Sequence, residues 1–191
     1  MLAIVEVTIS WLFKNAKGRD EKSFYRSPAF ADLPEPTVQI TSPEIAGPGS
    51  LAAPAQLRTE HSADGASKIP SLEWKEPEAL AGKVKEWLLV VEDPDAPLPT
   101  PIAHGIYGGI NVTKTRIEQS DLEVLDDSKN LLKGGFHYGM CRRPVIVALS
   151  EPLSKAVLEV KPQPTREQVA EEIRGKVLSW GVWVGQYERK W

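Results

Sequence analysis

A run of five apolar residues at positions 87–91, Trp-Leu-Leu-Val-Val, restricts the possible folds of this chain more than any other feature. The run is too short for a typical helix, and charged pairs close it at both ends, Lys85-Glu86 and Glu92-Asp93. A half-buried strand alternates apolar and polar residues, whereas an unbroken apolar run fits a strand that is buried on both faces. The sequence therefore predicts a buried strand at residues 87–91.

A second strand is predicted at residues 104–110, His-Gly-Ile-Tyr-Gly-Gly-Ile. Side chains alternate between the two faces of a strand, which places His104, Ile106, Gly108 and Ile110 on one face. Glycine occupies three of these seven positions. Because glycine inside a strand often marks close contact with another backbone or with a ligand, we expect such a neighbour here.

The N-terminal third contains one further predicted strand and a long loop. Residues 37–41 alternate β-forming and polar residues between two prolines, which indicates a half-buried strand. Residues 42–70 are rich in Pro, Gly, Ala and Ser, and they show neither the helical nor the strand period. We interpret them as a long loop or an excursion at the edge of the sheet.

A helix and a last strand are predicted near the C-terminus. Residues 165–168, Thr-Arg-Glu-Gln, form a capping box, in which the threonine and glutamine side chains satisfy backbone amides of the first turn. We expect the helix to continue to about Leu178 and a strand to follow at residues 182–187, where apolar and polar residues alternate. No internal repeat occurs, so residues 1–191 are expected to form one domain.

Composition excludes several classes of function. The 23 basic and 26 acidic residues are spread along the chain and give a net charge of −3, so no basic face is offered to nucleic acid. Cys141 is the single cysteine, which suits a reducing, cytoplasmic location.

The apolar residues 1–13 lack the basic start of a signal peptide and fall short of a membrane span. We expect a packed N-terminal helix within residues 1–20, with an interfacial anchor as the alternative.

The segment Asp-Pro-Asp-Ala-Pro at residues 93–97 carries the candidate site. Pro94 and Pro97 fix the backbone and remove two hydrogen-bond donors, so the carboxylates of Asp93 and Asp95 have a set direction. His104 follows closely enough for the connecting loop to bring it beside them, and a carboxylate would fix its tautomer. The imidazole and nearby amides could then donate to a phosphate or carboxylate. From the residues alone, a rigid turn beside an ordinary core histidine remains the alternative.

The sequence from Val91 to Pro97, followed by a histidine at the start of the next strand, resembles the signature of the phosphatidylethanolamine-binding protein family. Residues 64–74, residues 136–139 and the pair Arg142-Arg143 resemble further segments of that family. The resemblance implies a mainly β fold of antiparallel sheets, with an N-terminal helix and a helix before the last strand. It also implies a small cleft for phosphate-like groups.

The expected cleft residues are Asp93, Pro94, Asp95, Pro97 and His104. His137 and Tyr138 could stand near the cleft, and the alternative for these two residues is an ordinary half-buried strand. Relatives carry a Gly-x-His-Arg-Tyr-like segment, with a second cleft histidine, before a stretch like residues 147–152. This segment is missing here, as though one turn and one strand near residues 140–147 had been removed. Either residues 145–149 fill the gap, or the sheet is destabilised because its neighbours' backbone groups stay unpaired.

The resulting hypothesis is a non-enzymatic protein that binds a phosphate-bearing small molecule, a phospholipid head group or another anion. One alternative is an inhibitor that binds a protease or a kinase through residues 42–70 or the N-terminal helix. Another is a degenerate family member with an incomplete cleft. Acid-base hydrolysis by the Asp-His pair is a less favoured possibility. No cofactor and no metal are expected: His61 has no partner at ligand spacing, and no nucleophile elbow occurs.

Overall fold

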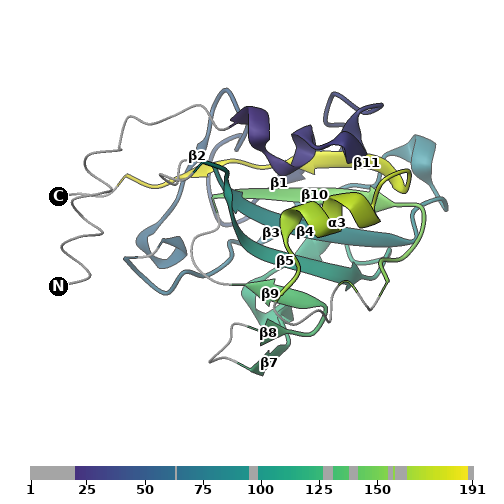
Figure 1. The fold of residues 1–191 in the computed structure, drawn as a ribbon. Coiled ribbons are helices and arrows are strands. Elements are labelled where there is room, and N and C mark those ends of the chain that lie inside the picture. The colour runs from purple at the N-terminus through teal and green to yellow at the C-terminus, as the bar shows by residue number, and fades with distance from the viewer. Residues whose placement is uncertain are drawn as a thin grey trace.

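A seven-stranded antiparallel sheet forms the centre of the structure, in the order β11-β10-β4-β5-β9-β8-β7 (Figure 1). The computed structural model describes residues 20–62, 64–94, 99–126, 131–137, 142–154, 157 and 163–188. The strands of this sheet are β4 (Glu86–Asp93), β5 (Ile102–Ile110), β7 (Val124–Asp126), β8 (Leu131–Leu132), β9 (Gly135–His137), β10 (Arg143–Leu149) and β11 (Val177–Val182).

Two small sheets and several short helices surround the central sheet. One small sheet has the order β1-β3-β6, with β1 (Ile40–Thr41), β3 (Leu72–Trp74) and β6 (Arg116–Ile117); the other pairs β2 (Ala55–Gln56) with β12 (Gly185–Gln186). The β2–β12 pair is parallel, unlike the antiparallel sheets that were expected. The helices are α3 (Arg166–Glu172) and the 3₁₀ turns η1 (Asp20–Lys22), η2 (Phe24–Arg26), η3 (Pro28–Phe30), η4 (Thr59–His61), η5 (Glu78–Leu80) and η6 (Gln119–Asp121).

Strand β4 confirms the prediction drawn from the apolar run. All of its residues are buried, and it pairs with β10 on one side and β5 on the other. Its odd-numbered residues Trp87, Leu89 and Val91 pack into one hydrophobic core, while Leu88 and Val90 pack into a second. The side chains of this strand therefore join two cores on opposite faces of the sheet.

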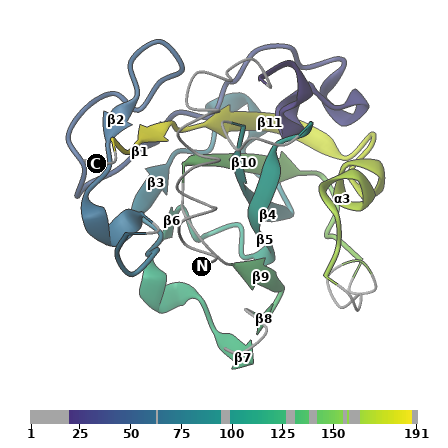
Figure 2. The ribbon, with the colours of Figure 1, turned by 60° about the vertical axis from the view of Figure 1, so that its left-hand side comes forward.

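These two cores have different coverings (Figure 2). The small sheets cover the first core, to which they contribute buried residues such as Ile40, Leu72 and Ile117. Residues 24–30 and α3 cover the second core, with Phe24 and Val169 among its buried members.

The expected mainly β class with antiparallel sheets is confirmed. In the described ranges, no helix is both long and apolar enough to cross a bilayer.

Strand β5 departs from the strict alternation that the sequence predicted. Its register against β4 shifts between the pairs Leu89–Tyr107 and Trp87–Ile110, where Gly109 has a φ of +74°. A left-handed glycine is typical of a β-bulge, which inserts one residue and changes the phase of the side chains. Ile106 consequently packs in the second core and Ile110 in the first, so the two do not share a face.

The predicted strand at residues 37–41 is shorter than expected. Only Ile40 and Thr41 pair as β1, and they pair with β3. The amides of Thr37 and Val38 instead both donate to the carbonyl of Trp180, at 2.9 Å each. Residues 42–70 hold β2 and η4, and their side chains Ile45, Ala55, Leu57 and Ile69 are buried in the first core. The segment is thus packed against the sheet.

The capping box at the start of α3 is present as predicted. The amide of Gln168 donates to Thr165 Oγ1 at 3.2 Å, and the Thr165 amide donates to Gln168 Oε1 at 2.8 Å. The helix ends at Glu172, earlier than expected, because Gly175 with a φ of +75° turns the chain back toward the sheet. Leu178 therefore lies in β11, and the strand predicted at 182–187 is divided between the end of β11 and β12.

Strand β10 lies between β4 and β11 and pairs with both along its length. The neighbours' backbone groups do not stay unpaired, because residues 145–149 pair with β11 on one side and with β4 on the other. The predicted N-terminal helix within residues 1–20 falls almost entirely outside the described residues. The described chain starts with η1, η2 and η3, and Phe24, Tyr25 and Phe30 of this segment are buried in the second core.

Candidate functional site

Asp93 and His104 come together where β4 ends, as the sequence predicted. His104 Nε2 lies 3.9 Å from Asp93 Oδ2, and the two side chains are only 13% and 7% exposed. The register of β5 shifts between the pairs Val91–Gly105 and Glu92–Ala103, so His104 is an extra residue in a second bulge. The distance between these two atoms suits an ion pair and exceeds that of a hydrogen bond.

Arg142 is the third member of this site. Its Nε lies 3.7 Å from Asp93 Oδ2, so Asp93 stands between a guanidinium and an imidazole. The position follows from the antiparallel register of β10 and β4: Arg143 pairs with Glu92, which brings Arg142 opposite Asp93. Arg142 was not a predicted site residue. The sequence places Arg142 directly before residues 143–149. Its role in the site follows only once these residues are known to pair with β4.

His137 adjoins the site from β9, opposite Gly105 of β5. Burial lowers the pKa of its imidazole; a hydrogen bond to the Ser67 carbonyl opposes this change, and the charge of His104 reinforces it. Its Nε2 donates to that carbonyl at 3.4 Å. A Cβ on Gly105 would lie 2.9 Å from His137 Nδ1. The expected close neighbour of this glycine is therefore the protein itself.

The segment around Ser67 forms a wall beside His137. Ser67 has a φ of +51° and is held by its amide, which donates to the Ser62 carbonyl at 3.2 Å. His61 is 2% exposed and donates through Nδ1 to the Lys68 carbonyl at 3.1 Å, which fixes the next residue along the chain. His61 and Ser67, both within the predicted loop at residues 42–70, thus support the candidate site. No local sequence pattern indicates this role.

Several predicted site residues cannot be placed. Asp95, Pro97 and Tyr138 lie outside the described residues, as does Cys141. Pro94 follows Asp93 directly in a turn at the end of β4. The structure therefore brings together Asp93, His104 and His137 of the predicted set.

The opposite face of the sheet carries a second polar cluster. Glu92 is fully buried; both of its carboxylate oxygens accept from the amide of Phe24, at 3.2 and 3.0 Å, and Arg166 Nη1 donates to Oε2 at 2.8 Å. Burial raises the pKa of the Glu92 carboxyl, against the Phe24 hydrogen bond and the charge of Arg166, which lower it. Beside it, Arg143 Nη1 bonds to Asp20 and to Ser23.

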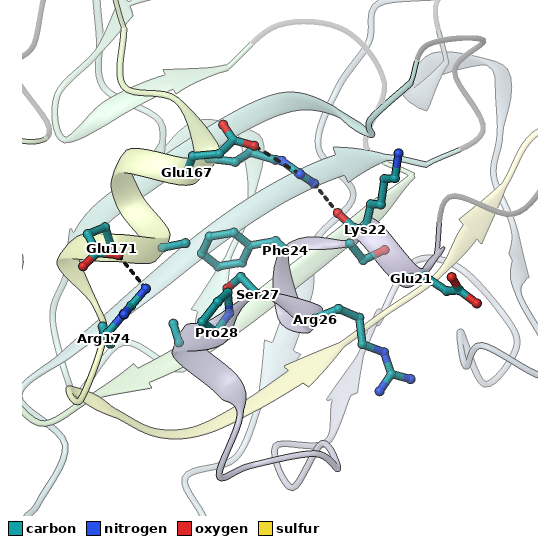
Figure 3. Close-up of a pocket in the computed structure, with 13 residues that line it drawn as sticks. Glu21, Lys22, Phe24, Arg26, Ser27, Pro28, Glu167, Glu171 and Arg174 are labelled. Atoms are coloured by element: carbon teal, nitrogen blue, oxygen red, sulfur yellow. Dashed lines mark hydrogen bonds and ion pairs between the residues drawn. The ribbon is translucent and has the colours of Figure 1, made fainter.

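A groove of about 340 Å³ opens next to this second cluster, between residues 21–29 and one face of α3 (Figure 3). Phe24 and Ala170 contribute apolar surface, and Arg166 and Arg174 stand among the lining side chains. The groove lies on the face of the sheet opposite Asp93 and His104. We assign the candidate site to the Asp93 cluster because its charged and imidazole groups converge there.

The chemistry available at the Asp93 cluster is that of hydrogen-bond donation to an anion. Guanidinium and imidazole N–H groups both donate to phosphate and carboxylate oxygens, and a carboxylate can receive an ammonium group. Within the described part of the chain, no group of three or more His, Cys, Asp or Glu side chains has the arrangement of a metal site.

Comparisons with known proteins agree with this architecture. The family model for phosphatidylethanolamine-binding proteins matches residues 43–188. Two fungal relatives, each named phomoidride biosynthesis cluster protein B, are 36% identical and align with the whole chain. One, from Fungal sp. (strain ATCC 74256), is covered over 97% of its length, and the other, from Talaromyces stipitatus, over 84%. The chain therefore belongs to the phosphatidylethanolamine-binding protein family.

Two solved structures share the fold. A putative phosphatidylethanolamine-binding protein homologue, CT736 of Chlamydia trachomatis, superposes with a TM-score of 0.55 at 18% identity, over 82% of this chain and all of its own. YbcL of E. coli, described as a new member of the mammalian family, gives a TM-score of 0.57 at 21% identity, over 80% of this chain and 99% of its own.

Proposed function

We propose that this protein binds a small anionic molecule, without breaking a bond in it, at the cluster of Asp93, His104 and Arg142, which we call the proposed cleft. The observation that carries the proposal is the position of Asp93 Oδ2, 3.9 Å from the imidazole of His104 and 3.7 Å from the guanidinium of Arg142. Two groups able to donate to one anion thus share a single counter-ion inside the protein.

The arrangement favours a phosphate or carboxylate as the bound group. Arginine donates two parallel hydrogen bonds to either anion, and partial burial of the three side chains strengthens such bonds relative to water. The Asp93 carboxylate would meanwhile attract a ligand ammonium group, so a zwitterion such as phosphorylethanolamine fits both charges. A simple dicarboxylate would use the cationic groups alone.

The names of the fungal relatives support a small molecule as the ligand. Both relatives are named for a biosynthesis cluster, which favours an organic acid or a phosphorylated metabolite over a kinase or protease partner. The inhibitor alternative requires a projecting contact segment. Residues 42–70, the first candidate for such a segment, bury Ile45, Leu57 and Ile69 in the core, so the structure lends that alternative no support.

An NMR titration tests the proposal. Phosphorylethanolamine and succinate are added separately to the protein, and the His104 and His137 imidazole resonances are followed, with His104→Ala as the control. We expect saturable shifts with at least one of the two probes, absent in the control, and ligand signals that stay unchanged over hours. Unshifted imidazoles at millimolar concentrations of both probes would overturn the proposal, and formation of a hydrolysis product would show catalysis instead.

A further inference from the structure

Residues 20–26 form a polar junction behind the candidate cleft, before the span matched by the family model. That span starts at residue 43, yet this earlier segment is part of the packed structure. Phe24 and Tyr25 are 1% and 3% exposed, and the Tyr25 ring stacks on Trp180 with centroids 4.8 Å apart. The segment is therefore anchored by its aromatic side chains, and its polar groups point at three other parts of the chain.

The first contact is with the end of β4. Glu92 accepts two hydrogen bonds from the Phe24 amide and one from Arg166 of α3. Arg166 Nη1 also donates to the Lys22 carbonyl at 3.1 Å, and so it joins α3 to the segment beside the groove. These bonds leave the buried Glu92 carboxylate held from two sides.

The second and third contacts are with β10 and with the chain before β5. Arg143 bonds to Asp20 and to Ser23, and Lys22 Nζ donates to the Pro99 carbonyl at 2.9 Å. Glu92 and Arg143 are cross-strand partners in the β4–β10 ladder. One short segment thus contacts both members of this pair and also Pro99, shortly before β5.

The immediate neighbours of this pair are the charged residues of the cleft. Asp93 follows Glu92, Arg142 precedes Arg143, and Asp93 and Arg142 form the ion pair on the other face of the sheet. Because consecutive side chains of a strand point to opposite faces, a change in the twist or spacing of the ladder at Glu92 and Arg143 moves Asp93 and Arg142 as well.

We propose that residues 20–26, acting through Glu92 and Arg143, are a positioning element that sets the spacing of Asp93 and Arg142 in the cleft. The proposal rests on the function proposed above, since it concerns the same cleft. Glu92 touches no ligand in this account. It acts by fixing the backbone from which the ligand-binding side chains project.

Glu92→Gln tests this role, because glutamine keeps the shape of the side chain and removes its charge. The matched control is Glu86→Gln at the other end of β4, where a buried carboxylate on the same face accepts a hydrogen bond from the Gly109 amide at 2.8 Å. Two quantities are measured for each variant: the ligand-free His104 and His137 imidazole shifts, and the affinity for phosphorylethanolamine. Lys22→Met, an exposed change that removes the contact with Pro99, is measured in parallel.

We expect Glu92→Gln to move the ligand-free His104 resonance and to weaken phosphorylethanolamine binding by about fivefold or more, with smaller effects in the same direction for Lys22→Met. Glu86→Gln should leave both quantities unchanged.

Equal effects of the two glutamine variants, or no effect of Glu92→Gln and Lys22→Met, would overturn the positioning role. If the wild type binds no probe while Glu92→Gln still moves His104, the proposed ligand is wrong and the positioning role stands. If Glu92→Gln does not fold, Lys22→Met decides.

Discussion

Glu92 and Asp93 are adjacent in β4, yet their carboxylates belong to two separate clusters on opposite faces of the sheet. Glu92 lies 2.8 Å from Arg166 Nη1 and is fully buried, whereas Asp93 lies 3.7 Å from Arg142 Nε at the candidate cleft. Two carboxylates of the same strand end therefore have different functions in this account, one structural and one in ligand binding.

The consecutive arginines of the next strand should differ in the same way. Arg143 is 9% exposed and bonds to Asp20 and Ser23, while Arg142 is 23% exposed at the cleft. Arg143→Met should lower the free energy of unfolding by about 1–3 kcal/mol, because buried bonds are lost. Arg142→Met should lower it by less, because Arg142 is the more exposed of the two and its Nε lies 3.7 Å from Asp93 Oδ2, beyond hydrogen-bond distance. Urea unfolding of both variants measures the difference, and equal losses would contradict the separation of the two clusters.

Gly105 is required by the contact between β5 and His137. In Gly105→Ala the new Cβ would lie 2.9 Å from His137 Nδ1 and 3.2 Å from the Phe136 carbonyl oxygen. We expect a loss of about 1–3 kcal/mol in the free energy of unfolding and a shift of the His137 imidazole resonance. Gly82→Ala is the control. An added Cβ at this position has no neighbour within 4 Å, so its cost comes only from the backbone strain of a φ of +75°. An undisturbed His137 in Gly105→Ala would contradict the described contact.

The buried carboxyls at both ends of β4 should make stability depend on pH. Burial raises the pKa of both Glu86 and Glu92 above the ordinary value of 4.5, so the folded protein retains these protons to higher pH than the unfolded chain does. Their contribution to stability is present below pH 4.5 and is lost as the pH rises through the raised pKa values.

Wild type and Glu92→Gln should therefore differ in their unfolding free energies by an amount that changes with pH. We expect the wild-type value minus the variant value to fall as the pH rises above 4.5 and then to level off. The lowered pKa of His137 affects both proteins equally and cancels in the difference. Urea unfolding from pH 4 to 8 gives this curve, and a difference that rises with pH would show that the Arg166 ion pair outweighs burial.

Much of the fold could be predicted because its signals are local. The apolar run at residues 87–91 and the capping box at residues 165–168 depend on neighbouring residues only, and both elements are present. The bulges at His104 and Gly109 could not be predicted, because they arise from the register between two strands. The Gly109 bulge also explains why Ile106 and Ile110 face different cores.

The candidate site was predictable in part for the same reason. Asp93 and His104 lie on neighbouring strands joined by a short loop, so their meeting followed from the sequence order. Arg142 directly precedes β10, which is distant in sequence and becomes their neighbour only through its pairing with β4. The support from Ser67 likewise depends on a carbonyl position in an irregular segment, which no residue pattern specifies.

A calorimetric titration with phosphorylethanolamine tests the central claim most directly. Wild type, Arg142→Met and Arg143→Met are titrated under the same conditions, since the two variants remove neighbouring arginines from opposite faces of β10. The account predicts saturable binding to wild type. Arg143→Met should also bind, with an intermediate loss of affinity of about fivefold, because Arg143 belongs to the positioning element; its protein concentration is corrected for the unfolded fraction. Arg142→Met should bind at least about tenfold more weakly, the cost of losing a charge-assisted contact of about 1.5–3 kcal/mol. Binding that survives in Arg142→Met at wild-type affinity would contradict the assignment of the cleft.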